Sequence, residues 1–183
     1  MDPLQEKIIV DYRRAVADLE YFLGQATPAE LQNQSAGTKW TNEELLFHMV
    51  FGFMVTRTLL PLVRVVTKLP RSWRKGFARL LNAGTIPFDI ANYWGSKLAR
   101  RVYNRHRMAT KLIKTTQSLL KQLGAETPVS LTQEMDFPTR WDPFFHTGMT
   151  LAELYTYPTL HFDFHARQLT LNTPPAPPHS QSR

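Results

Sequence analysis

The 183-residue sequence contains no cysteine. This absence excludes a disulfide framework, a metal site built from thiolates and a cysteine nucleophile. It also favours a reducing compartment, because disulfides are found mainly in proteins of oxidising environments. Residues 1–20 lack the apolar run of a signal peptide, and no stretch approaches the ~20 uncharged apolar residues that span a membrane. We therefore expect a soluble, cytoplasmic protein with no integral membrane association.

Acidic residues are scarce in the middle of the chain. Between Arg57 and Lys114 there are fourteen Lys and Arg residues and a single acid, Asp89, whereas the rest of the chain has eight bases and fourteen acids. The net charge of +7 is therefore concentrated in one segment, which predicts one positive surface or pocket mouth. A run of Lys and Arg is more often the solvated side of a helix than a nucleic-acid interface. Nucleic-acid binding is thus the least favoured function.

Apolar residues recur at helical spacing in four segments, and this pattern predicts an all-α fold, a four-helix bundle. The first helix covers residues 4–23 and stops at Gly24. The second and fourth helices begin at capping boxes, in which a Thr hydroxyl and a Glu side chain satisfy each other's backbone donors. The predicted ranges are 41–69 for the second helix, 88–123 for the third and 150–171 for the fourth. Pro61 should kink or split the second helix, and Pro158 should interrupt the fourth.

The connections carry three further predictions. Residues 71–82 have the pattern of a short basic amphipathic helix between helices two and three. Residues 124–149 are rich in proline, glycine and aromatic residues, which indicates a long ordered loop packed by its own rings. The Pro-rich residues 173–183 cannot continue a helix and should form a disordered tail after a single domain, 1–172.

Three histidines are the candidate metal ligands. His161 and His165 are four residues apart on one predicted helix, so both imidazoles project from the same face. Such a pair alone is weak evidence for a metal site. His48 lies on the buried stripe of a different helix. Taken alone, His48 is more simply interpreted as a core histidine with a single hydrogen bond than as a metal ligand. Three imidazoles on two inward faces would leave coordination positions for water or substrate, as in an open metal site.

Several sequence segments resemble the DinB-like (DinB/YfiT) superfamily of metal-binding four-helix bundles. The first segment, residues 37–48, contains Trp40, the capped helix start and His48. The other segments are the loop 137–145, the helix start 149–154 and residues 161–169, which contain the paired histidines. The resemblance implies that His48, His161 and His165 bind one divalent metal ion, most commonly zinc or nickel, with manganese and iron as alternatives. It also implies an up-down-down-up bundle and a homodimer.

The resemblance leaves the reaction open. One branch of the family consists of thiol S-transferases, which implies that the metal activates an exogenous low-molecular-weight thiol and presents it to an electrophile. Positive residues near the pocket would then receive an anionic cosubstrate. A related hydrolase would use the same three histidines to activate water. The non-enzymatic alternative is a metal-stabilised stress-response protein that binds a small ligand without chemistry.

Five further residues are candidates for substrate binding: Trp40, Asn92, Tyr93, Trp141 and Gln168. Large aromatic residues at helix starts and in long loops are more often packing anchors, and this alternative applies to Trp40 and Trp141. Gln168 lies one turn beyond His165. Asp163 should point away from the histidine pair because of its helical spacing, so we do not expect it to be a ligand.

Overall fold

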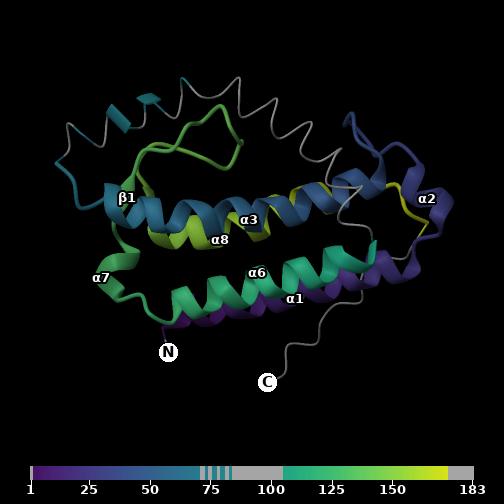
Figure 1. Ribbon diagram of the computed structural model, residues 1–183, viewed down its shortest axis with the longest axis horizontal. Coiled ribbons are helices and arrows are strands. Elements are labelled where there is room, and N and C mark those ends of the chain that lie inside the picture. Colours follow the sequence, from purple (N-terminus) through teal and green to yellow (C-terminus); the bar gives the residue numbers. More distant parts are fainter. Residues whose placement is uncertain are drawn as a thin grey trace.

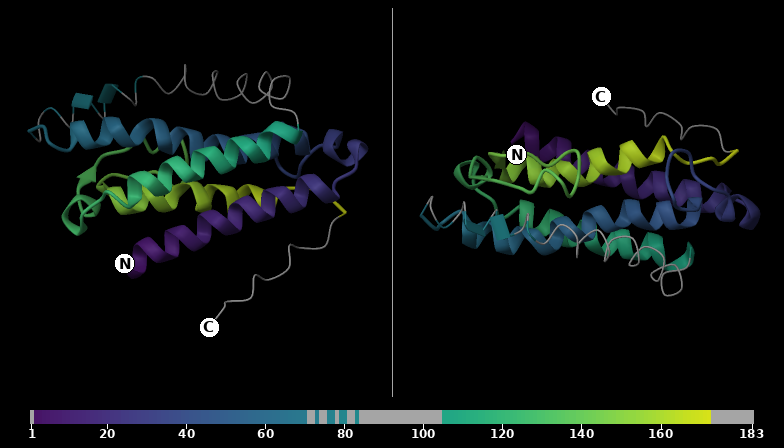
Figure 2. Two further views of the ribbon diagram at one scale, coloured as in Figure 1. Left: turned by 60° about the horizontal axis from the view of Figure 1, so that its bottom comes forward. Right: turned by 90° about the horizontal axis from the view of Figure 1, so that it is seen from above.

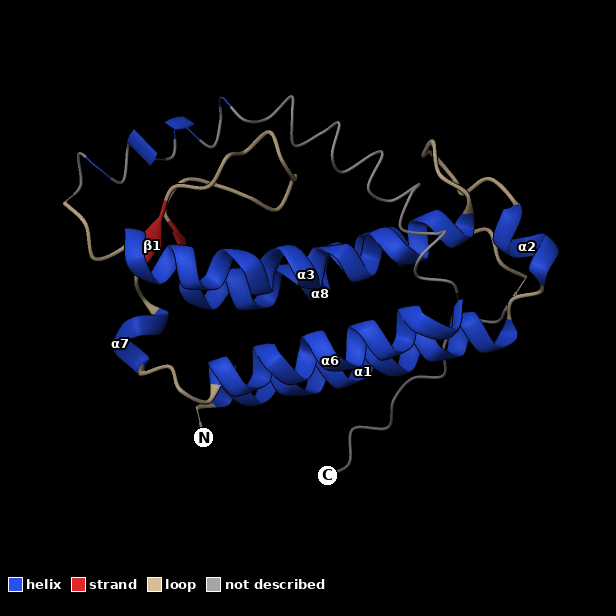
Figure 3. Cartoon of the chain, viewed as in Figure 1, coloured by secondary structure: helices blue, strands red, loops and turns tan. Residues whose placement is uncertain are grey.

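The structure is a computed structural model that describes residues 2–70, 73, 76, 77, 79, 80, 83 and 105–172, except for the side chain of His106. The described chain is predominantly helical, which confirms the all-α class (Figure 3). Its long helices are α1 (Pro3–Gln25), α3 (Asn42–Val66), α6 (Arg105–Leu123) and α8 (Leu151–Ala166). Two short helices, α2 (Pro28–Gln32) and α7 (Pro128–Leu131), lie in the connections.

The long helices lie side by side around one apolar core. Helix α3 packs against α8 and α6, and α1 packs against α6 and α8. Helices α1 and α8 run in one direction, while α3 and α6 run in the other (Figures 1 and 2). The core consists of large apolar side chains from all four helices, which are removed from water and provide the main stabilisation of the fold. Fully buried examples are Tyr12, Leu19, Leu46, Phe53, Leu112 and Phe162.

The helix starts follow the sequence signals closely. Thr41 and Glu44 form the predicted capping box at the start of α3, and Thr150 and Glu153 form the other at the start of α8. The helix ends differ more from the prediction, since α3 stops at Val66 rather than at Leu69 and α8 stops at Ala166 rather than at 171.

Neither internal proline divides its helix. Pro61 lies inside α3 and Pro158 lies inside α8, and both helices continue through them. Pro61 therefore does not split α3, and the predicted interruption of α8 at Pro158 is wrong. A proline removes one backbone hydrogen bond of the helix, and packing of the surrounding residues in the core compensates for that loss.

Residues 167–172 leave the helix because they bond to the start of α3. The Thr170 backbone N–H donates to the Asn42 side chain at 3.0 Å, and the Asn42 amide donates to the Thr170 hydroxyl at 3.0 Å. Ala36 also donates its N–H to the carbonyl of Gln168 at 2.8 Å. These bonds join the end of α8 to the loop and helix start that carry Trp40 and His48.

The connection 124–149 is more structured than a loop. It contains α7 and two short antiparallel strands, β1 (Glu134–Met135) and β2 (Met149–Thr150). Strands of two residues are too short to give an alternating pattern, so the sequence did not reveal them. The prediction that aromatic rings pack this segment is confirmed, since the ring centroids of Phe137 and Phe145 are 5.2 Å apart.

Several predictions concern residues that the structure does not describe. The tail 173–183, the first part of helix three and the candidate residues Asn92 and Tyr93 lie outside the described residues. Within the predicted helix 71–82, the described residues 73, 76, 77, 79 and 80 have helical backbone. Trp73 and Leu80 are exposed there.

Helix α3 is long and apolar enough to cross a membrane by length and composition. A core helix meets the same criterion, and much of α3 is buried against α6 and α8. This property alone therefore does not decide where the protein is located. The charged residues Arg57 and Arg64 interrupt its apolar sequence, in line with the absence of an uncharged run of ~20 residues.

Candidate metal centre

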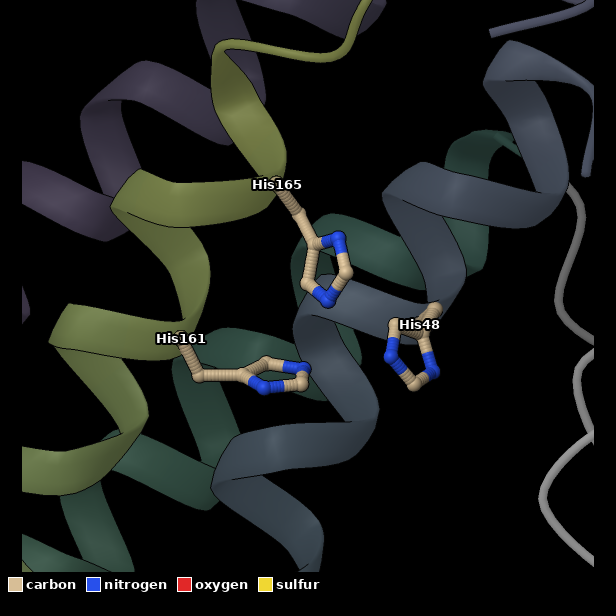
Figure 4. A group of neighbouring side chains, drawn as sticks. All are labelled: His48, His161 and His165. Atoms are coloured by element: carbon tan, nitrogen blue, oxygen red, sulfur yellow. The ribbon is translucent and has the colours of Figure 1, made fainter. Parts of the chain in front are cut away.

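Three histidine rings from two helices meet at one point inside the protein. His48 comes from α3, and His161 and His165 come from α8; all three point toward one another (Figure 4). One ligand nitrogen from each ring lies within 4.8 Å of the other two, and the ring centroids are 4.6–4.8 Å apart. Their exposed fractions are 4%, 4% and 9%. These three buried histidines are close enough together to hold a metal ion.

Asp142 fixes the orientation of His161. The Nδ1 atom of His161 is 2.7 Å from the Asp142 carboxylate, which also accepts a hydrogen bond from the Tyr157 hydroxyl at 3.0 Å. Burial opposes ionisation of Asp142, but the hydrogen bond from His161 keeps the pKa of the carboxyl below its usual value. A carboxylate is an acceptor, so in the neutral imidazole Nδ1 carries the proton and Nε2 has the lone pair. A carboxylate behind an imidazole is a common outer partner of a metal-binding histidine.

The opposite nitrogen of His161, Nε2, is buried and makes no hydrogen bond to any described residue. The cost of leaving a buried acceptor unsatisfied is ~1–3 kcal/mol. A metal ion at the centre of the three rings would satisfy this lone pair, so the donor set fits a divalent ion.

His165 has a similar arrangement with a neutral partner. Its Nδ1 atom is 2.7 Å from the side-chain oxygen of Gln168, so it donates its proton there and Nε2 keeps the lone pair. Burial and, as a smaller cause, the neighbouring His161 lower the pKa of His165 to about 4. The ring is therefore neutral at pH 7, as a metal ligand must be.

Gly52 allows His161 to lie close to α3. A Cβ atom at this position would be 2.8 Å from Cδ2 of His161 and 3.4 Å from its Nε2. Gly52 follows His48 by one helical turn, so it lies on the same side of α3. The His161 ring from α8 therefore passes over a residue without a side chain as it approaches His48. Any larger side chain would move the ring.

Trp40 covers His48 from the loop that precedes α3. The two rings are stacked, with centroids 4.3 Å apart. The loop is held by hydrogen bonds at Trp40, whose carbonyl accepts from the Ser35 N–H at 3.0 Å and from the Ser35 hydroxyl at 2.8 Å. The stacked tryptophan keeps the imidazole on the inward side of α3.

A cavity of about 200 Å³ opens from the histidines. Its walls are mainly aromatic and come from α3 and the loop that precedes it, from α8 and from the loop between β1 and β2. Besides the three histidines, Gly52 and Asp142, they consist of Trp40, Phe51, Val55, Trp141, Pro143, Phe144, Phe145, Tyr157 and Phe164. The histidine cluster is therefore at the end of a pocket, with room for a small molecule beside it.

Comparison of the chain with protein-family models, curated proteins and solved structures finds no match. The site is therefore interpreted from its own geometry. The structure brings the predicted residues His48, His161 and His165 together with Trp40, Trp141 and Gln168. Trp40 and Trp141 line the cavity, while Gln168 contacts His165.

Asp163 points away from the cluster, as predicted, and pairs with Arg14 of α1 at 2.8 Å. Sequence reasoning missed Asp142, Tyr157 and Gly52. Tyr157 had a signal, since it precedes His161 by one helical turn. Asp142 had none, because no helical or strand spacing relates the loop residue to the histidine that it contacts.

Proposed function

We propose that this chain binds one divalent metal ion through His48, His161 and His165, and that it is a four-helix bundle of the DinB-like type. The directions of the four long helices are compatible with the up-down-down-up order of that family. Three neutral nitrogen ligands suit zinc or nickel. We further propose a homodimer, which follows from the family resemblance alone, and a cytoplasmic location, which follows from the absence of cysteine and of the apolar run of a signal peptide in residues 1–20.

The unsatisfied Nε2 atom of His161 carries the proposal. A histidine that served only to pack the core would need one hydrogen bond, and Asp142 already provides it. The second nitrogen lies on the side of the ring that faces the two further imidazoles (Figure 4). A bound cation accounts for this arrangement better than packing does.

The pocket beside the cluster supports a metal that takes part in a reaction. A divalent ion in this position would supply Lewis acidity, which lowers the pKa of a thiol or a water molecule. The chain itself orients the ligands, through Asp142 behind His161 and Gln168 behind His165. Aromatic walls formed by Trp40, Trp141 and neighbouring rings limit the access of water.

Thiol chemistry fits the described pocket better than hydrolysis does. Apart from the three histidines, the titratable side chains among its described lining residues are Asp142 and Tyr157, and both are hydrogen-bonded at His161. Hydrolysis commonly requires a separate general base or acid, whereas a thiol with an ordinary pKa of ~8.5 needs only a modest shift. We therefore propose a metal-dependent S-transferase that uses an exogenous low-molecular-weight thiol.

Metal analysis tests the central part of this proposal. The purified protein should bind one equivalent of zinc, and His161→Ala should lose tight binding. His146→Ala is the matched control, because His146 is half-exposed on the loop and lies outside the cluster. Equal zinc binding by wild type and His161→Ala, or none by wild type, would overturn the proposal.

An activity assay then separates the enzymatic proposal from the alternative. The metal-loaded protein is incubated with low-molecular-weight thiols and an alkyl electrophile, and thioether formation is compared with that of the metal-free protein. Metal-dependent turnover supports the S-transferase. Tight zinc binding that stabilises the fold without any turnover would instead support a non-catalytic stress-response or ligand-binding protein.

A further inference from the structure

A second cavity adjoins the pocket at the histidines. It has a volume of about 280 Å³ and is lined by Phe51, Met54, Val55, Thr58, Leu59 and Trp141. Three of these residues, Phe51, Val55 and Trp141, also line the pocket at the histidines. The two cavities therefore share walls, and we call the second one the apolar channel.

The apolar channel follows α3 away from the metal centre. His48, Val55 and Leu59 are separated by seven and four residues, so they lie near one side of the helix. The distance along the helix axis from His48 to Leu59 corresponds to roughly 16 Å at a rise of ~1.5 Å per residue. Trp141, from the loop between β1 and β2, provides a wall that belongs to both cavities. Together, the linings of the two cavities extend further along α3 than a water molecule or a small thiol at the histidines would reach.

The described walls of the apolar channel offer nothing to a charged group. No Lys, Arg, Asp or Glu is among its described lining residues. The polar side-chain groups among these residues are the indole N–H of Trp141 and the Thr58 hydroxyl, which donates to the carbonyl of Met54 at 3.0 Å. Burying a charge without a partner is strongly unfavourable. The anionic cosubstrate expected from the basic segment is therefore not matched by these walls.

Most side chains that line the apolar channel are only partly buried, so the channel is accessible from solvent. Phe51, Met54, Val55 and Trp141 pack against the core but keep part of their surface exposed. Apolar atoms that line an accessible cavity gain free energy when an apolar ligand replaces water.

We propose that the site binds a small amphipathic molecule whose oxygen or sulfur head reaches the three histidines and whose uncharged alkyl or aromatic tail occupies the apolar channel. This inference rests on the proposed metal site, because the head requires the ion. It assigns to that site substrates with an uncharged apolar tail, which we call the apolar substrate class.

Straight-chain alkyl hydroxamates of two to eight carbons are suitable probes, since the hydroxamate head chelates zinc. Their affinity for the zinc-loaded protein is measured by calorimetry. The dissociation constant should fall about fourfold with each added methylene until the channel is filled. A six-carbon hydroxamate with a terminal carboxylate should lose this gain, because its charge would enter the apolar walls.

Met54→Gln tests the position of the tail, because Met54 lines the apolar channel but not the pocket at the histidines. The ratio of affinities between the six-carbon and two-carbon hydroxamates should fall at least about threefold in this variant. Leu62→Gln is the control: Leu62 is on the same helix, is 39% exposed and lies outside both described linings. Zinc binding measured on each sample verifies that it is folded.

The outcomes distinguish the two proposals. If zinc does not bind, both the metal site and the apolar substrate class are refuted. If zinc binds but affinity does not rise with chain length, or if the carboxylate probe binds as well as its uncharged counterpart, the apolar substrate class alone is refuted. If Met54→Gln and Leu62→Gln show the same ratio of affinities for the six-carbon and two-carbon hydroxamates, the tail does not occupy the apolar channel. This result would also refute the apolar substrate class.

Discussion

The contact between Gly52 and His161 gives the sharpest prediction. In Gly52→Ala, the added Cβ would lie 2.8 Å from Cδ2 of His161. Carbon atoms prefer separations of ~3.5–4.0 Å, so the ring has to move by at least ~0.7 Å. Metal–ligand distances tolerate only about ±0.2 Å, and the displaced imidazole would no longer reach the ion. We expect zinc affinity to fall by at least the ~10–100-fold that loss of an outer ligand partner causes.

Stability should change much less than zinc affinity. Overpacking costs ~1–3 kcal/mol, whereas replacing glycine by alanine inside a helix gains about 1 kcal/mol. The two effects leave a net destabilisation of roughly 0–2 kcal/mol for the metal-free protein. The variant should therefore remain folded while it loses the site.

The assay pairs a zinc competition titration with urea unfolding of the metal-free protein. Gly24→Ala is the matched control, because Gly24 lies in α1 and a Cβ there meets nothing within 4 Å. It should bind zinc like the wild type. Wild-type zinc affinity in Gly52→Ala would refute the reasoning, since His161 could then not be both at this distance and a ligand.

Three further predictions concern the partners of the site and the stability of the fold. Asp142→Asn should weaken zinc binding ~10–100-fold in a competition titration, because the carboxylate that fixes the His161 tautomer loses its charge; unchanged affinity would mean that this contact only packs the core. Zinc at ~100 times its dissociation constant should stabilise the wild type by about 2.7 kcal/mol in urea unfolding, and a chelator should remove this gain. The Glu126 carboxylate accepts hydrogen bonds from Arg64, Tyr155 and Ser130. Burial favours the neutral form of Glu126, but the hydrogen bonds from Ser130 and Arg64 keep its pKa below the ordinary value. Because this pKa is lowered, the contribution of ionised Glu126 to folding stability is complete above the pKa of ~4.3 in the unfolded chain. It is lost as the pH falls through the pKa of Glu126 in the folded protein. Glu126→Gln should thus lower the free energy of unfolding by ~1–3 kcal/mol, and this difference should be constant from pH 7 to 5 and shrink below about pH 4. A difference that grows toward low pH would contradict the lowered pKa of Glu126.

The sequence was most informative where a local rule acts over a few residues. The capping boxes at Thr41 and Thr150 located two helix starts, and a spacing of four placed His161 and His165 on one face. The helix ends were less predictable because they depend on distant partners. Asn42, for example, bonds to Thr170 and so keeps the residues after α8 out of the helix.

The outer partners of the histidines show the same limit. Gln168 is three residues from His165 and was within reach of local reasoning. Asp142 reaches His161 only because the loop between β1 and β2 lies against α8, a tertiary arrangement with no periodic signal. Gly52 was visible on the stripe of His48, but the ring that requires its small size belongs to a helix about a hundred residues later.

The proposed coordination is tested most directly by X-ray absorption at the zinc edge of the protein loaded with one equivalent of zinc. We expect three imidazole nitrogens at ~2.0–2.1 Å, with the remaining coordination supplied by solvent or substrate atoms. A zinc coordination sphere with fewer than three imidazoles would contradict the proposed site.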